Sequence, residues 1–302
     1  MKKYLSKIAL FFVLMVVIDV AYGFMAEWLF AHAKGGDTGR LYYINRVQEE
    51  DILVFGSSRA IHHYDPRILE DSLGMSCYNC GKDGNGILTM YPILVNITNR
   101  YTPKVIIYEV TASFDLINEH NNDKYLSLSR PFYGDERVSE LFYNIDESSR
   151  FKIYSSLYRY NGWLMSMLSD NLHPSNSDIK GYRPEQGIIN YDPGKEKDKF
   201  AGSTIEYDNL KMEYLQMLID KCNASGIKLI FAVSPQFMQE DDTVFSPMFE
   251  LAGHNNIPVL NHYCDTDFVR KKNYFCDRTH LNGNGAEAYS KVVAQEVRDV
   301  IE

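Results

Sequence analysis

Short apolar runs alternate with amphipathic stretches along much of the chain. The apolar runs lie at 51–56, 75–81, 103–110, 226–235 and 257–260, and all have the length of strands. Helical patterning appears at 65–74, 86–100, 205–223, 244–254 and from about 285 to the end. This alternation predicts an α/β domain with a parallel sheet, right-handed crossovers and helices on both faces. In such sheets, ligands bind beyond the carboxyl ends of the strands.

The regular alternation stops between about 111 and 204. This segment is rich in tyrosine and phenylalanine, and the stretch 146–168 has the pattern of one helix. We interpret the segment as a helical cap inserted into an α/β domain that extends over 51–302. Its aromatic rings either stack on the sugar rings of a substrate or form the core of the cap.

The chain opens with basic residues followed by an apolar run. Lys2, Lys3 and Lys7 precede the unbroken run 8–18, and apolar character resumes after Asp19. Basic residues hold this end in the cytoplasm and send the rest across the membrane. Read through Asp19, the run reaches the ~20 residues of a transmembrane helix. Cut at Asp19, it is the apolar part of a signal peptide with a cleavage site at 21–23.

We favour an uncleaved anchor at 1–30, followed by a polar connector at 31–50. The run is apolar all round rather than striped, which argues against a buried helix of a cytosolic protein. A carboxylate is costly inside a membrane, so Asp19 either contacts a membrane partner or lies near the outer interface. The remaining chain is then expected in the periplasm or outside a bacterial cell.

Composition narrows the classes of function. The 302 residues are 45% hydrophobic and 24% charged, which suits a globular protein with a full core. The net charge of −9 argues against a partner such as nucleic acid, which needs a basic face. Five cysteines are too few for a disulfide scaffold and lack the pairing of a zinc site.

The cysteines raise two smaller questions. Cys77 and Cys80 have redox-motif spacing, but residues three apart in a strand point to opposite faces, so we do not expect a redox site. Cys264 and Cys276 flank the loop before the last helix. They form a disulfide if the domain is exported, or remain free buried thiols.

Candidate chemistry lies in the loops that follow the strands. Ser57 and Ser58 come directly after the first strand, and the segment 79–86 after the second is rich in glycine. A serine needs a base to become a nucleophile, and Asp277-x-x-His280 near the C-terminus can supply one. The carboxylate holds the His280 Nδ1–H and leaves Nε2 for the serine. The alternative is that the hydroxyls only cap the next turn.

These segments resemble the blocks of the SGNH/GDSL hydrolase superfamily over most of 51–301, apart from the insertion. Gly56-Ser57-Ser58 is similar to the Gly-Asp-Ser block, which aligns Ser58 with the nucleophile. The resemblance implies Gly84 as an oxyanion residue, with the amide of Ser58, and Asp277 and His280 as the acid–base pair. The third block normally supplies an oxyanion Asn, and here the aligned stretch offers Ser113. The fold implied is a flavodoxin-like three-layer α/β/α sheet domain.

Several neighbouring residues are candidates for substrate binding. Arg59 either binds a substrate carboxylate or phosphate or forms a structural ion pair. Arg183 is expected on a lid over the site, and Asn85 is placed to reach the oxyanion. His62 and His63 are expected to line the pocket or face solvent rather than act in catalysis.

The predicted function is a membrane-anchored serine esterase or O-acyltransferase acting on acyl esters, above all acetyl esters, of cell-envelope polysaccharide. The resemblance extends to anchored members that work beside membrane polysaccharide O-acyltransferases, so such a partner is expected. No metal or cofactor is implied. The alternative is a catalytically weak glycan-binding or assembly subunit that keeps the fold.

Overall fold

The computed structural model describes residues 2–134, 136–175, 178–191, 205–238 and 241–302. The chain forms two compact units. The N-terminal unit comprises Met1–Val47 and Asn122–Asn176, and the sheet unit comprises Gln48–Asn121 and Ser177–Glu302. Part of the segment interpreted as a cap thus groups with the N-terminal helix.

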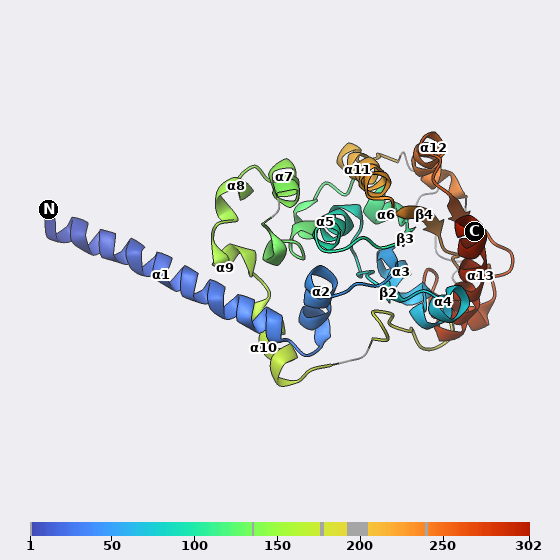
Figure 1. The fold of residues 1–302 in the computed structure, drawn as a ribbon, viewed down its shortest axis with the longest axis horizontal. Coiled ribbons are helices and arrows are strands. Elements are labelled where there is room, and N and C mark those ends of the chain that lie inside the picture. The colour runs from blue at the N-terminus through green and yellow to red at the C-terminus, as the bar shows by residue number, and fades with distance from the viewer. Residues whose placement is uncertain (1, 135, 176–177, 192–204, 239–240) are drawn as a thin grey trace. The chain divides into compact units, whose positions relative to one another are not determined.

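The sheet unit is built on five parallel strands in the order β2-β1-β3-β4-β5, as predicted (Figure 1). This is the flavodoxin-like order, in which β2 is added on one side of β1 and the later strands on the other, so that the order switches between β1 and β3. Pairs such as Gly56↔Glu109 place the carboxyl ends of the central strands side by side. The strands are β1 Ile52–Gly56, β2 Cys77–Asn79, β3 Val105–Glu109, β4 Lys228–Val233 and β5 Val259–Asn261.

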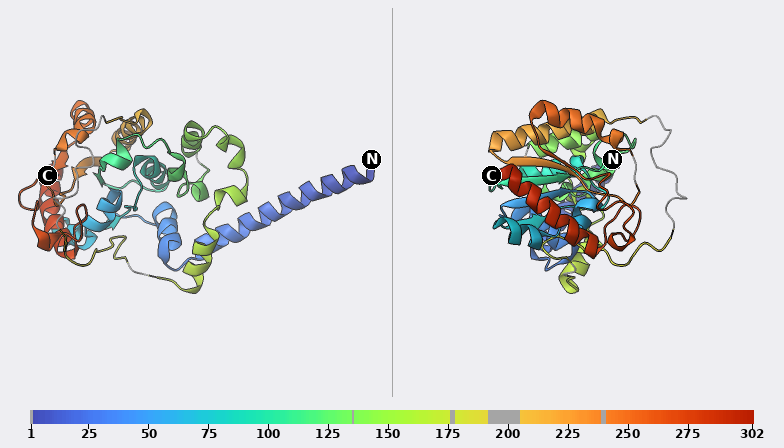
Figure 2. Two further views of the ribbon diagram at one scale, coloured as in Figure 1. Left: turned by 180° about the vertical axis from the view of Figure 1, so that it is seen from behind. Right: turned by 90° about the vertical axis from the view of Figure 1, so that its right-hand side faces the viewer.

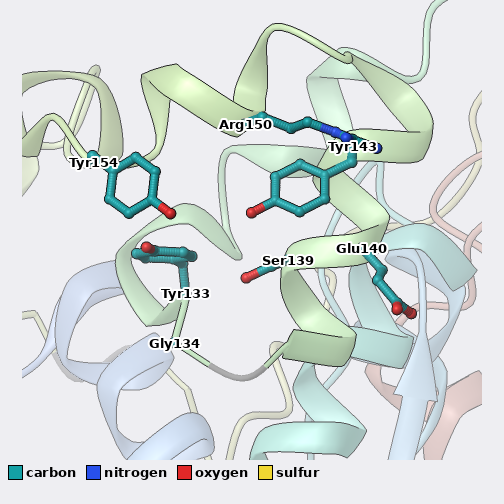
Figure 3. Close-up of a pocket in the computed structure, with 7 residues that line it drawn as sticks. All are labelled: Tyr133, Gly134, Ser139, Glu140, Tyr143, Arg150 and Tyr154. Carbon is teal, nitrogen blue, oxygen red and sulfur yellow. The ribbon is translucent and has the colours of Figure 1, made fainter.

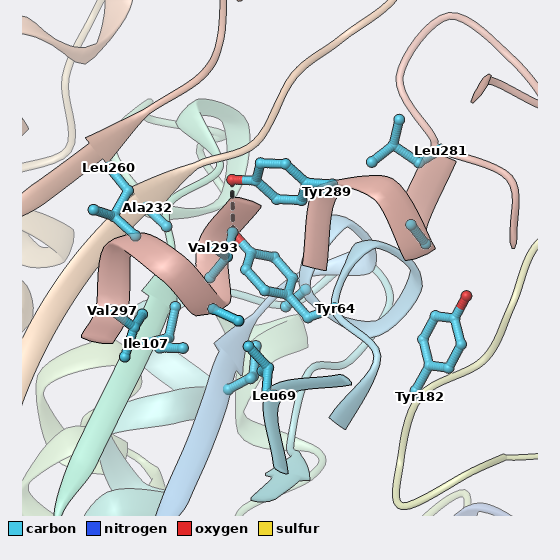
Figure 4. Close-up of a cluster of buried hydrophobic side chains, with 14 of the residues drawn as sticks. Tyr64, Leu69, Ile107, Tyr182, Ala232, Leu260, Leu281, Tyr289, Val293 and Val297 are labelled. Carbon is cyan, nitrogen blue, oxygen red and sulfur yellow. Dashed lines mark hydrogen bonds between the residues drawn. The ribbon is translucent and has the colours of Figure 1, made fainter. Parts of the chain in front are cut away.

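Helices cover both faces of this sheet (Figure 2). On one face Leu69 of α4 and Val293 and Val297 of α13 pack with Ile107 of β3 (Figure 4). Alternate strand residues point to the other face, where α5 and α11 pack together. The helices of the unit are α3 Ser58–His63, α4 Pro66–Leu73, α5 Ile87–Thr98, α6 Ala112–Asp115, α11 Asn209–Ser225, η4 Asp242–Phe245, α12 Ser246–Asn255, η5 Lys272–Tyr274 and α13 Gly283–Ile301.

Local sequence explains the helix ends well. Asp65 caps α4 by accepting a hydrogen bond from the Arg67 amide, Pro66 occupies the first helical position, and Gly74 ends the helix with a φ of 66°. Asn282 caps α13 in the same way by accepting from Asn284 and Gly285. The second cap sets the start of the C-terminal helix at Gly283, a short distance along the chain from His280.

The N-terminal unit is helical in its described part. Its elements are α1 Lys2–His32, α2 Gly36–Arg46, η1 Asp123–Leu126, η2 Arg130–Phe132, α7 Glu136–Ile145, α8 Ser149–Lys152, α9 Ser156–Arg159 and α10 Leu164–Leu172. A core of Ala26, Phe30, Phe132, Trp163 and Met167 joins α1 to the later helices. The polar connector expected at 31–50 therefore contains a helix, α2, which contributes Leu41 to this core.

The single helix predicted for 146–168 is wrong. The stretch is divided into α8, α9 and the start of α10. The amides of Ser156 and Leu157 donate to the Asp19 carboxylate of α1, so the chain starts a new helix there instead of continuing the first. Gly162, with a φ of 84°, separates α9 from α10.

α1 is the one described helix long and apolar enough to cross a membrane. It has a mean hydropathy of 2.4 over its most apolar window, and little of that window is buried in the protein. Its length and composition fit either a membrane anchor or a signal sequence.

Candidate active site

The turn after β1 brings a serine to the end of the sheet. Gly56 ends the strand with a φ of 137°, a value that strongly favours glycine. Helix α3 then begins at Ser58 without a connecting loop. Asn79, at the end of β2, donates to the carbonyls of Ala60 and Tyr64 and so fixes α3 against the sheet.

Ser58, His280 and Asp277 form one hydrogen-bonded chain. The Ser58 Oγ lies 2.9 Å from the His280 Nε2. The His280 Nδ1 lies 2.8 Å from the Asp277 Oδ2. The Asp277 Oδ1 accepts from the amides of Thr279 and His280, both at 2.7 Å, which holds the carboxylate in the turn. The three side chains predicted from sequence are therefore brought together.

The carboxylate of this chain is held in its ionised form. Burial alone would raise the pKa of Asp277, but the hydrogen bond from His280 and the amide hydrogen bonds outweigh burial and lower the pKa to about 2. An ionised Asp277 accepts the Nδ1–H of His280. The imidazole then presents its Nε2 lone pair to the hydroxyl of Ser58.

Ser57 lies in a different environment from Ser58. It is fully buried, and its hydroxyl lies 2.6 Å from the Thr111 Oγ1. Ser58, in contrast, is partly exposed and contacts the imidazole. Of the two serines in this turn, the geometry therefore supports Ser58 and not Ser57 as the nucleophile.

A buried polar network joins α3 to the loop that carries His280. His63 is fully buried, its Nδ1 lies 2.8 Å from the Ser234 Oγ, and its Nε2 accepts from the Leu281 amide at 3.0 Å. Ser234 in turn donates to Glu109 at 2.7 Å. Burial, together with the charge of Arg59, holds the pKa of His63 well below its usual value, so the ring is neutral. A neutral ring can both donate and accept, as these contacts require.

His62 is held by hydrogen bonds at both of its ring nitrogens. Its Nδ1 lies 2.6 Å from the Arg183 carbonyl, and its Nε2 lies 2.9 Å from the Asp83 carboxylate. Burial alone would lower the pKa of His62, but these two hydrogen bonds and the charges of Asp83 and Glu185 raise it. Both ring nitrogens face acceptors, so the geometry suits an imidazolium. The rings of His62 and His280 are 5.6 Å apart.

The loop after β3 is shaped by a buried carboxylate, Asp115. It accepts hydrogen bonds of 2.7 Å from the Ile87 amide, the Tyr108 hydroxyl and the Thr111 amide. Burial raises the pKa of Asp115 to about 6, although these hydrogen bonds act in the opposite direction. This carboxylate fixes Thr111, the residue of this loop whose hydroxyl contacts Ser57.

The predicted oxyanion residues fall into two groups. The amides of Ser58 and Gly84 donate to no protein acceptor within the described ranges, so both are available to a ligand. Gly84 has a φ of 67°, which explains why glycine is needed there. Ser113, the third expected oxyanion residue, lies in α6, where its carbonyl accepts from Lys211. The residue of this loop whose side chain contacts the serine turn is Thr111, which lies beside Ser57.

Asn85 is turned back toward its own segment. Its Nδ2 donates to the Asp83 carbonyl, and its Oδ1 accepts from the Thr89 hydroxyl. These contacts orient the glycine-rich loop on the first turn of α5. They give Asn85 a structural role in place of the expected contact with the oxyanion.

Arg59 is buried in an ion pair rather than presented to a substrate. Its Nε lies 3.2 Å from the Glu109 Oε1 and 3.0 Å from the Ser234 Oγ. The guanidinium also faces the Tyr263 ring at 5.6 Å. A cation held in this way neutralises the fully buried Glu109, and of the two interpretations the structural ion pair is the one that the contacts support.

Arg183 lies beside the site through its backbone. Its amide donates to the Ile61 carbonyl and its own carbonyl binds His62, which fastens the segment 178–191 to α3. The guanidinium lies 4.0 Å from Asp178 and is about one quarter exposed. The hydrogen bond from His62 lowers the pKa of Asp83 against the opposing effect of burial, and the charge of Arg183 adds a minor lowering contribution. Arg183 therefore remains a candidate for contact with substrate.

All five cysteines are free thiols, so the disulfide considered for Cys264 and Cys276 is not formed. The Cys276 thiol instead faces the His280 carbonyl at 3.5 Å. Burial raises the pKa of Cys77 well above its usual value, which leaves no thiolate for redox chemistry. No cluster of metal-binding side chains occurs among the residues that the structure describes.

A separate pocket of about 670 Å³ lies within the N-terminal unit (Figure 3). Three tyrosine rings, from Tyr133, Tyr143 and Tyr154, surround it together with Ser139 and Arg150. The Arg150 guanidinium lies 5.2 Å from the Tyr143 ring. The lining of this pocket is thus both aromatic and polar.

The sequence matches no family model and no curated protein. Similar solved structures include a protein assigned to the G-D-S-L lipolytic family from Desulfitobacterium hafniense, at 10% identity over 81% of this chain and 98% of that one (TM-score 0.40). An acetyl xylan esterase is 13% identical over 83% and 100% (TM-score 0.41). A protein assigned as an acylhydrolase from Bacteroides fragilis is 11% identical over 90% and 94% (TM-score 0.40). Their descriptions include the superfamily that the sequence resembles. These identities and TM-scores are too low to support an argument about activity, which therefore rests on the residues of this chain.

Some residues of the site gave no sequence signal. Glu109 is the last residue of β3 and Ser234 directly follows β4, and neither stands out in the sequence from an ordinary strand end. Their position at the carboxyl edge of β3 and β4 is the only feature that marks them in advance. Thr111 lies within the segment compared with the third block, two residues from the position we chose.

Proposed function

We propose that this protein is a membrane-anchored serine esterase or O-acyltransferase. The observation that carries the proposal is the hydrogen-bonded chain Ser58–His280–Asp277, with 2.9 Å and 2.8 Å between successive side chains. A hydroxyl, an imidazole and an ionised carboxylate in this order form the device that activates serine for acyl transfer. The partial exposure of Ser58 gives a substrate access.

The first half-reaction forms an acyl-enzyme. The Ser58 Oγ attacks the ester carbonyl carbon while the His280 Nε2 takes the hydroxyl proton. The amides of Ser58 and Gly84 donate to the oxyanion of the tetrahedral intermediate. His280 then gives its proton to the departing alkoxide, the carbon–oxygen ester bond breaks, and the alcohol leaves.

The second half-reaction uses the same base in reverse. His280 takes a proton from the incoming hydroxyl, whose oxygen attacks the carbonyl carbon of the Ser58 acyl ester. The bond from this carbon to the Ser58 Oγ then breaks, and the His280 Nε2 returns the proton to the serine oxygen. Water as the acceptor gives hydrolysis, and a sugar hydroxyl gives acyl transfer. Asp277 stays ionised throughout and stabilises the imidazolium that forms in each half.

We propose acyl, above all acetyl, esters of cell-envelope polysaccharide as the substrate class. α1 supports an anchor because its apolar side chains are exposed to the surroundings while its C-terminal half packs into the N-terminal unit. Cleavage at 21–23 would remove Asp19, which binds α9, so these contacts favour a retained helix. A membrane O-acyltransferase that supplies or receives the acyl group remains the expected partner.

The proposal is tested by hydrolysis of p-nitrophenyl acetate with the full chain in detergent. Ser58→Ala should lower kcat/KM by at least about 10³-fold, as loss of a serine nucleophile does. Ser57→Ala is the matched control and should retain most activity, because its hydroxyl contacts Thr111 and not the imidazole. Equal rates for the wild type and Ser58→Ala would refute an esterase.

A second candidate is a glycan-binding subunit without efficient catalysis, supported by the tyrosine-lined pocket of the N-terminal unit. The two candidates differ in what Ser58→Ala does to the modified polysaccharide in the cell. An enzyme loses function, whereas a binding subunit keeps it. Tyr143→Ala alters the pocket and leaves the triad intact, so a binding subunit should lose function and an enzyme should keep it.

A further inference from the structure

We propose that the turn between α8 and α9, residues 151–157, is inserted into the outer leaflet of the membrane beside α1. The proposal rests on the membrane anchoring proposed above and deepens it, because it turns one anchoring helix into a larger membrane-contacting surface. It concerns the N-terminal unit alone, within which the contacts are defined (Figure 1).

Asp19 lies within the long apolar part of α1. The helix carries no other charge between Lys7 and Glu27. This interval spans about 30 Å at ~1.5 Å per residue, which is the thickness of the hydrocarbon core at about 30 Å. Asp19 then lies about 12 Å below the outer edge. A carboxylate at that depth requires partners.

Asp19 finds its hydrogen-bond donors at the start of α9. Its carboxylate accepts from the Ser155 hydroxyl at 2.7 Å and from the amides of Ser156 and Leu157, both at 2.9 Å. All three donors belong to the start of α9. A hydrogen bond fixes the donors at the depth of the acceptor, so the start of α9 must enter the leaflet with Asp19. Gly23 completes the contact, because a Cβ there would overlap the Ser156 hydroxyl.

The turn between α8 and α9 exposes large apolar side chains on its surface. Phe151 is 82% exposed and Leu157 is 46% exposed, although both side chains are large and apolar. Such a group of exposed side chains next to an apolar helix fits a lipid surface. The adjacent cations are accommodated: Lys152 pairs with Asp146 at 2.8 Å, and Arg159 donates to the Ser156 hydroxyl at 3.1 Å. Long cationic side chains can also reach the headgroups.

The lipid contact is measured directly by tryptophan quenching. Each reporter is introduced into a Trp28→Phe chain, in which the buried Trp163 gives a constant background, and the protein is reconstituted into phosphatidylcholine vesicles brominated on the acyl chains. Phe151→Trp reports on the turn, Phe12→Trp on α1, and Lys291→Trp on an exposed position of α13 in the sheet unit.

We expect the tryptophans at 151 and 12 to lose most of their added emission in brominated vesicles, and the tryptophan at 291 to lose almost none. Quenching at 12 without quenching at 151 would overturn the inference, with the turn facing water, a second copy or another protein. Absence of quenching at 12 would instead overturn the anchoring. The esterase assay reads the triad independently of both outcomes.

Asp19 is tested as the residue that holds the turn in place. Asp19→Ala should abolish quenching at 151 and leave quenching at 12 unchanged, because α1 is apolar without it. Asp19→Asn keeps one acceptor oxygen and should retain part of the signal. Unchanged quenching at 151 in Asp19→Ala would contradict the proposed role of this carboxylate.

Discussion

At the residue scale, Asp277 decides which nitrogen of His280 carries the proton. Replacement of Asp277 by Asn should lower kcat by about 10³–10⁴-fold, because an amide can donate to Nδ1 and stabilise the unproductive tautomer. Steady-state kinetics with an acetyl ester measures the loss. Asp267→Asn is the matched control, since Asp267 is exposed and its carboxylate pairs with Lys271 at the surface. A D277N chain as active as the control would show that His280 does not need this orientation.

Asp115 gives a prediction about the dependence of stability on pH. Its pKa is raised to about 6 by burial, whereas its usual value is 3.8. Between these values the folded state binds more protons than the unfolded state, so the free energy of unfolding decreases as pH rises through this window. The loss amounts to about 3 kcal/mol for this group.

The Asp115 contribution is measured by denaturant unfolding at a series of pH values. Asp115→Asn does not titrate and should show a flatter profile between pH ~4 and ~6. The exposed Asp267→Asn should retain the slope of the wild type. If the free energy of unfolding falls as steeply between pH ~4 and ~6 in Asp115→Asn as in the wild type, the assignment is excluded.

At the element scale, His63 connects α3 to the loop of His280 and is a positioning residue. His63→Ala leaves the Leu281 amide without its buried acceptor, a loss of about 1–3 kcal/mol. We expect kcat to fall while KM changes little, since the loop shifts but the substrate surface remains. His63→Gln, which can both donate and accept, should restore part of kcat.

The control for this element is His254→Ala, at an exposed position of α12. It should match the wild type in kcat and in unfolding. A His63→Ala variant that loses stability but keeps kcat would reduce His63 to a purely structural role.

The close packing of α1 on α9 predicts that a Gly→Ala substitution in α1 destabilises the protein. Gly→Ala inside a helix normally stabilises it by up to about 1 kcal/mol. Gly23→Ala should instead lower the Tm, because its Cβ would overlap the Ser156 hydroxyl. Gly253→Ala in α12, where a Cβ meets nothing within 4 Å, should raise or maintain the Tm. Stabilisation by both substitutions would mean that α1 does not pack on α9.

At the scale of the whole molecule, local patterning and long-range contacts differ in how well they can be predicted. The five strands and their helices follow from apolar runs, caps such as Asp65 and glycines such as Gly74. The Asp-x-x-His spacing also led to the site, because a short turn brings Asp277 and His280 together. The division of 146–168 could not be foreseen, since its cause is a contact with Asp19 over 130 positions away.

The site shows the same difference. Ser58, Asp277 and His280 are marked by sequence, whereas the network of Glu109, Ser234 and His63 arises only when β3, β4 and α3 end at one edge of the sheet. Arg59 illustrates the ambiguity. Its position beside the serine suggested a substrate contact, and only the fold reveals that it neutralises the buried Glu109.

The central claim is that Ser58 is a nucleophile activated by His280, and covalent labelling tests it most directly. The full chain is treated with a fluorophosphonate, digested with trypsin, and the peptide of residues 47–59 is sequenced by mass spectrometry. We predict the added mass on Ser58, its retention in Ser57→Ala, and its loss in Ser58→Ala and His280→Ala. Labelling at Ser57, or no labelling of the folded wild-type chain, would contradict the account.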